Sequence, residues 1–184
     1  LPFLGFYRSL ASVLDSIGLS GARARRGLPV VLLLGVAVQG VQLLNTRQRD
    51  ELLQILREPY GFLMPVAAFA LLLCTVAATE EIFFRGLLQT RLANRLRSDA
   101  AGWALASLAF TVYHVPYAYL NPSWPSAGHL GPAIQLAAAN GLVAGAVIGA
   151  VYWRSGRNLF AAMVLHACVD LIPATRLMAG WLLK

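Results

Sequence analysis

Residues 60–85, YGFLMPVAAFALLLCTVAATEEIFFR, decide the fold of this 184-residue chain. The run is apolar as far as Ala78, and about 20 apolar residues are enough for a helix to cross the hydrocarbon core of a bilayer. No glycine–proline break separates this run from Glu80, Glu81 and the arginine-dotted stretch that ends near Arg97. The sequence therefore predicts a transmembrane helix that continues without interruption into a pair of carboxylates.

The composition of the whole chain extends this prediction to several helices. Hydrophobic residues make up 58% of the chain and charged residues only 12%, against about a quarter charged in ordinary soluble domains. A soluble domain of this size could not bury so much apolar surface, so lipid must cover part of it. We predict an all-α, polytopic transmembrane helix bundle of about five spans, at residues 28–44, 60–78, 100–119, 132–153 and 159–172.

The segment that precedes the first span has a different character. Apolar residues recur at helical spacing over residues 2–18, from Phe3 to Ile17, with polar residues between them. This pattern predicts an N-terminal amphipathic helix that lies in the membrane interface, followed by a basic linker. We therefore divide the chain into an interfacial segment, 1–27, and a transmembrane helical domain, 28–184.

Arginines at the ends of the apolar runs account for the formal charge of +7. On a soluble protein such an excess could indicate nucleic-acid binding, but here its placement favours membrane topology and anionic head groups, with no nucleic-acid partner. The loop at 118–131 carries no lysine or arginine, and the segment 45–58 mixes both charges. The positive-inside rule places the larger clusters in the cytoplasm: Arg23, Arg25 and Arg26; Arg91, Arg95 and Arg97; Arg154 and Arg157.

Glu80 and Glu81 need an explanation, because an ionisable group in lipid costs roughly 2.5–3.5 kcal/mol even on lenient scales. Arg85 lies one helical turn after Glu81, in the favoured order of acid before base. The guanidinium can thus hold one carboxylate ionised while Glu80 points away and exchanges protons. The alternative is a helix end whose carboxylates lie at the head-group level.

Two histidines occupy similar apolar settings. His114 lies one turn after Phe110, where a lone histidine can be a satisfied packing residue, and His166 lies one turn before Asp170, whose carboxylate can orient the imidazole. A hairpin that turns near Arg97, with Ser98 as the N-cap of the next helix, would place Glu81 and His114 both about 23 Å from the turn. The two side chains should then face each other.

A stripe of small residues lies in the fourth predicted span. Gly141, Gly145 and Gly149 are spaced four apart, so they share one helix face. Such a stripe permits close approach of a neighbouring backbone, and we interpret it as a helix-packing surface.

Three motifs, EEIFFR at 80–85, FTVYH at 110–114 and HACVD at 166–170, together resemble those of the CPBP family. These are the CAAX-protease and bacteriocin-processing enzymes, also called the Abi family, and they include the type II CAAX prenyl endopeptidases. The resemblance covers residues 61–172 and implies an intramembrane endopeptidase in which glutamate activates water. Its implied catalytic residues are Glu80, Glu81, Arg85, His114, His166 and Asp170.

The resemblance leaves two mechanisms open. One is a metalloprotease, with Zn²⁺ held by Glu81, His114 and His166, a ligand set that suits zinc; in the other no metal is present, and His166 with Asp170 stabilises or protonates the intermediate. Asp170 stands where the family has asparagine or aspartate, and an ionised aspartate cannot donate a hydrogen bond to an oxyanion. It would orient His166 or bind the metal instead. The substrate would be a peptide or protein, membrane-anchored in some relatives. The arginine and alanine bias points to a prokaryotic cell membrane, and the arginine clusters on one side predict a cleft that opens to the cytoplasm.

Two other functions use the same residues. A non-catalytic immunity or scaffold protein could keep the motifs as a binding site for peptides or helices. A proton-coupled transporter also needs buried carboxylates and histidines, although no inverted repeat of the transporter kind is visible in the sequence.

Overall fold

The computed structural model describes residues 27–122 and 124–182, and this part of the chain is helical with short connections and no strand. The all-α prediction is confirmed there. The predicted interfacial helix at 2–18 and the arginines of the following linker lie outside the described residues.

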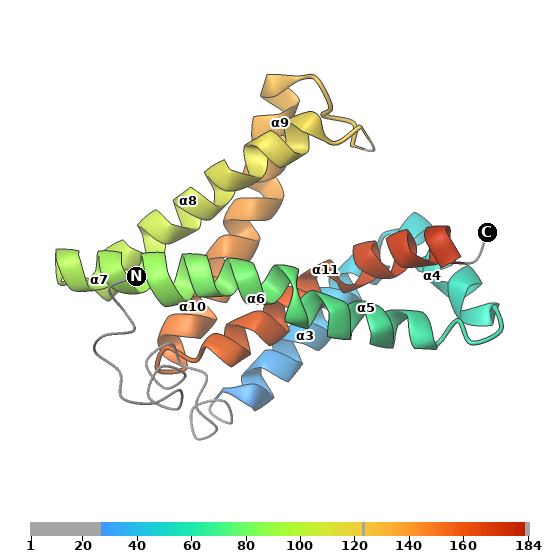
Figure 1. Ribbon diagram of the computed structural model, residues 1–184, viewed down its shortest axis with the longest axis horizontal. Helices are drawn as coiled ribbons and strands as arrows, with labels where there is room; N and C mark the ends of the chain where they lie inside the picture. The colour runs from blue at the N-terminus through green and yellow to red at the C-terminus, as the bar shows by residue number, and fades with distance from the viewer. Residues whose placement is uncertain (1–26, 123, 183–184) are drawn as a thin grey trace.

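The helices follow one another closely along the chain (Figure 1). Their bounds are α3 (Leu28–Leu43), α4 (Thr46–Arg57), α5 (Leu63–Cys74), α6 (Val76–Glu81), the π-helix η1 (Ile82–Gln89), α7 (Thr90–Leu96), α8 (Asp99–Leu120), α9 (Leu130–Leu136), the π-helix η2 (Ala137–Leu142), α10 (Val143–Arg154) and α11 (Leu159–Leu182). In Figure 1 the stretch from α5 to α7 runs across the molecule as one long rod. The long helix α11 packs against α5 and α3, while α8 packs against α7, η2 and α10.

Within the described ranges, three helical stretches are long and apolar enough to cross a membrane: Leu63–Leu96, Leu130–Arg154 and Leu159–Leu182. A fourth arises if α3 and α4, which meet at an angle of 104°, count as one bent span. The predicted count of five is thus not confirmed.

Two of the predicted spans differ in detail from the structure. The helix predicted at 100–119 forms as α8, but it is not among the spanning candidates. The last helix does not end at Ile172, since α11 continues through Pro173 to Leu182.

The hairpin between α7 and α8 forms where the sequence predicts it. Arg97 turns the chain in the left-handed conformation with φ 52°, and Ser98 caps α8 by accepting a hydrogen bond from the Ala101 N–H at 3.2 Å. The two helices touch at once, since a Cβ on Gly102 would lie 2.6 Å from the Ala93 nitrogen. The tight turn therefore fixes which residues of η1 and α6 lie at the same distance from the turn as which residues of α8.

The glycine stripe of the fourth predicted span packs against α8, as predicted. Gly141 lies against Thr111, Gly145 against Phe110 and Gly149 against Trp103. An added Cβ at Gly145 would lie 3.1 Å from the Phe110 ring. The absence of side chains therefore allows the backbone of η2 and α10 to approach α8 closely.

The α7–α8 hairpin, the α10–α11 turn and the start of α3 meet at one end of the molecule, and each lies next to arginines in the sequence. Arg157, in the α10–α11 turn, donates hydrogen bonds to Asp99 at 3.0 Å and to Asn94 at 3.4 Å, which tie this turn to the α7–α8 hairpin. A Cβ on Gly27, at the start of α3, would lie 3.0 Å from that of Ser155. This end is the one that the positive-inside rule assigns to the cytoplasm.

Topology can be tested with single cysteines in a background that lacks Cys74 and Cys168. Arg97→Cys should react with a membrane-impermeant maleimide only from the cytoplasmic side, and Pro122→Cys, at the other end of α8, only from the opposite side. Labelling of sealed vesicles of known orientation measures this. Reaction of both cysteines from one side, or in the reverse pattern, would contradict the topology.

Candidate active site

A change of helix type occurs where the two glutamates lie. Glu81 ends α6, and the chain continues as the π-helix η1 from Ile82 to Gln89, which includes Arg85. The π-helix is rare and occurs mostly as short bulges inside α-helices, often at functional sites. The sequence predicts a continuous helix here but offers no signal for this widening.

A buried ion pair forms the centre of the site. Glu81 is fully buried and Arg85 is 1% exposed, with the Arg85 Nη1 2.9 Å from Glu81 Oε1. The second guanidinium nitrogen donates to the Gly145 carbonyl of α10 at 3.1 Å, and the Phe110 ring lies 4.5 Å from the guanidinium carbon. The predicted pair of Glu81 and Arg85, one helix turn apart, is confirmed. Arg85 also links the helical stretch from α5 to α7 to α10 and α8.

His166 brings α11 into the same network. Its Nδ1 lies 2.7 Å from Glu81 Oε1, and its Nε2 lies 3.3 Å from Asp170 Oδ2. The contact with Asp170 was expected from the spacing of the two residues. The predicted set of Glu81, His114 and His166 also placed His166 near Glu81, and the structure shows the two side chains in direct contact. Carboxylates on both edges therefore fix the plane of the imidazole.

Glu80 points to the other side and faces both histidines. Its Oε2 lies 4.0 Å from His114 Nε2 and 3.9 Å from His166 Nε2. The same oxygen is buried and has no hydrogen-bond partner in the protein. His114 is held by its other nitrogen, since Nδ1 lies 2.8 Å from the Phe110 carbonyl.

The hairpin therefore places a glutamate and His114 at matching depth, as predicted, but the glutamate is Glu80 rather than Glu81. The reason is that Glu81 turns towards Arg85 and His166, so that only its neighbour faces α8. Together the six predicted site residues form one continuous cluster: Glu80, Glu81, Arg85, His114, His166 and Asp170.

The donor atoms of this cluster do not form a site for zinc. Among the described residues, no three histidine, cysteine, aspartate or glutamate side chains are arranged to hold a metal ion. The expected ligands Glu81, His114 and His166 do not form such a group, and Glu81 Oε1 and His166 Nδ1 bind each other directly. As they lie, these side chains do not fit a zinc ion, and zinc binding stays a prediction.

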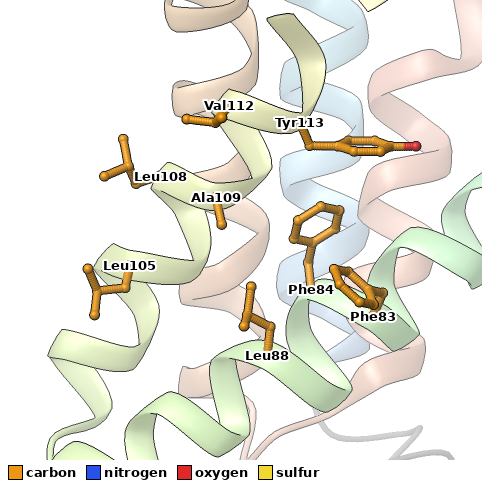
Figure 2. Close-up of a pocket in the computed structure, with 8 residues that line it drawn as sticks. All are labelled: Phe83, Phe84, Leu88, Leu105, Leu108, Ala109, Val112 and Tyr113. Atoms are coloured by element: carbon orange, nitrogen blue, oxygen red, sulfur yellow. The ribbon is translucent and has the colours of Figure 1, made fainter. Parts of the chain in front are cut away.

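An apolar groove of about 560 Å³ opens beside the polar cluster, between η1 and α8 (Figure 2). Figure 2 shows the rings of Phe83, Phe84 and Tyr113 gathered at one end of the groove. Tyr113 stacks edge-on to His114 at 5.3 Å, and Phe84 contacts Phe110 at 5.1 Å. These rings thus form the wall between the groove and the site. The sequence did not predict the groove, which depends on how far η1 and α8 diverge.

The fold and the site together define a class: a membrane-embedded helical protein with a buried cluster of carboxylates and histidines. A family model described as type II CAAX prenyl endopeptidase Rce1-like matches residues 62–172, and the chain belongs to this family. The match confirms the resemblance drawn from the three motifs and indicates a CAAX-type intramembrane protease. No curated protein and no solved structure matches the chain.

We predict that the Glu81–Arg85 pair behaves as a coupled unit. Arg85→Met should destabilise the protein by about 3–5 kcal/mol, because it leaves a buried carboxylate without its cation. Adding Glu81→Gln should recover part of that loss, since the uncompensated charge is then absent. Unfolding in detergent micelles measures each free energy.

The exposed pair of Arg47 and Glu51 supplies the control, because Arg47 is 83% exposed and its loss should cost less than about 1 kcal/mol. Losses for Arg85→Met and Glu81→Gln that simply add would show that the two side chains are not coupled.

Proposed function

We propose that this protein is an intramembrane endopeptidase in which a glutamate activates water and two histidines assist. The observation that carries the proposal is the position of Glu80 Oε2, which is buried, lacks a partner and faces Nε2 of both His114 and His166. These separations are too long for direct hydrogen bonds, and one water molecule could contact the carboxylate and an imidazole together.

In this mechanism Glu80 is the general base. It takes a proton from water as the water oxygen bonds to the peptide carbonyl carbon, which forms a tetrahedral intermediate with a negative oxygen. The carbon–nitrogen bond then breaks, and the proton passes to the leaving nitrogen, so that a carboxylic acid and an amine result. The acid then loses its remaining proton to the amine, which leaves a carboxylate and an ammonium group. No serine or cysteine nucleophile is needed.

The histidines have separate tasks in this account. His114 is held by the Phe110 carbonyl with its Nε2 towards Glu80, from where it can relay the proton to the leaving group. His166 is fixed by Glu81 and Asp170 and can stabilise the charge of the intermediate. Glu81 is thus an orienting residue, and Arg85 keeps its carboxylate in place.

The substrate class follows from the family and the setting. The family's description names prenylated CAAX ends, and we propose a peptide or protein substrate that is held at the membrane. We place the enzyme in a prokaryotic cell membrane, in line with the arginine and alanine bias of the sequence, and we place the end where the basic segments meet on the cytoplasmic side. The apolar groove beside the site offers a route for a substrate that arrives through the lipid.

Glu80→Gln and Glu81→Gln should each reduce hydrolysis at least about a hundredfold. The first substitution removes the general base, and the second releases His166 from its carboxylate partner. The measurement is cleavage of an internally quenched peptide with a prenylated CAAX end, by purified protein in liposomes. Glu58→Gln, an exposed glutamate at the end of α4, is the matched control and should keep full activity. Unchanged activity in both Glu80→Gln and Glu81→Gln would refute the catalytic proposal.

A further inference from the structure

The helix that carries His166 and Asp170 has a gap in its backbone hydrogen bonds. Pro173 lies inside α11 and has no N–H, so it cannot donate to the carbonyl of Val169, four residues earlier. A carbonyl that loses its helical partner in lipid costs several kcal/mol unless another donor reaches it. This carbonyl belongs to the residue immediately before Asp170.

Two glutamines of α3 reach this stretch of α11. The Gln42 side chain donates from Nε2 to the Val169 carbonyl at 2.6 Å, and Gln39 donates to the carbonyl of Cys168. We call Gln39 and Gln42 the glutamine clamp. The bond from Gln42 therefore replaces the one that Pro173 cannot make.

The close packing of α3 on α11 supports the same contact. Gly35 is buried one turn before Gln39, and a Cβ there would lie 2.9 Å from the Cys168 sulfur. Gly35, Gln39 and Gln42 lie on one face of α3, since they are spaced by four and three residues. A face built from glycine and glutamines is unusual in an otherwise apolar span, where polar side chains are expensive unless they are bonded.

We propose that the glutamine clamp positions His166 and Asp170 for the reaction. The clamp holds the backbone of residues 168 and 169, which lie between the two site residues, while neither glutamine contacts the reacting groups themselves. Without it, α11 would be free to bend at Pro173, and the His166 ring would shift relative to Glu80 and Glu81. This inference rests on the proposed function, because it assigns a positioning role for that reaction.

The experiment compares Gln42→Met in two backgrounds. Methionine keeps the length of glutamine and removes the donor, and Pro173→Ala restores a backbone N–H that can bond Val169. In the natural Pro173 background, Gln42→Met should lower kcat about tenfold on the prenylated CAAX peptide and leave KM within about twofold. In the Pro173→Ala background the same substitution should change kcat by less than about twofold.

Gln54→Met is the control for replacing a glutamine with methionine, because Gln54 is exposed on α4. This substitution should change neither kcat nor KM. A loss of kcat that is equal in the two backgrounds, or no loss in either, would overturn the clamp. A rise in KM with kcat unchanged would also contradict a positioning role for His166.

A second readout does not depend on activity. The rate at which diethylpyrocarbonate modifies His166, followed by mass spectrometry, should rise about fivefold in Gln42→Met, because a displaced ring leaves its two carboxylates. His114, on α8, should keep its rate, and Pro173→Ala should suppress the rise. No change at His166 would refute the clamp. A protein that cleaves no peptide would refute the proposed function, and the His166 rates would still decide the role of Gln42.

Discussion

The carboxylate of Glu81 is shared by Arg85 and His166, and the arrangement of the other site residues depends on this sharing. A charged group inside an apolar bundle is stable only where its partners are in place, so the rod that carries Glu81 cannot move away from α11 without exposing an unpaired charge. The bond from Arg85 to the Gly145 carbonyl extends the same constraint to α10. With Glu81 fixed in this way, the adjacent Glu80 faces His114 of α8 and the Nε2 of His166.

Polar side chains that bind backbone carbonyls hold the helices together at several other points. Gln89 donates to Gly149, Trp103 to Ala146 and Gln42 to Val169, each from one helix to the next. Lipid supplies little hydrophobic force between helices, so close packing and such hydrogen bonds take its place. The glycine stripe of α10 serves both purposes, because it lets α8 approach and leaves its carbonyls within reach of Arg85 and Gln89.

Patterns that act within one helix could be read from the sequence. The pairs Glu81–Arg85 and His166–Asp170, the cap at Ser98 and the glycine stripe all depend on local spacing, and all are found. Between helices, the sequence indicated only the matching depth of the glutamates and His114, not which side chains make contact. The bond from Glu81 to His166 depends on the rotation of two helices about their axes, and the choice of Glu80 as partner of His114 follows from it. The π-helix after Glu81 has no sequence signature either, and the predicted count of five spans is not confirmed.

The central claim is that Glu80 directs water onto the substrate and does not itself attack the peptide bond. A single turnover in H₂¹⁸O, with enzyme in excess over the peptide, tests this claim most directly. Direct attack by water places the label in the new carboxylate of the product, which mass spectrometry detects, and leaves the enzyme unlabelled. An attack by a glutamate would instead form an anhydride, whose hydrolysis at the glutamyl carbonyl would place the label in Glu80 or Glu81 and contradict the account.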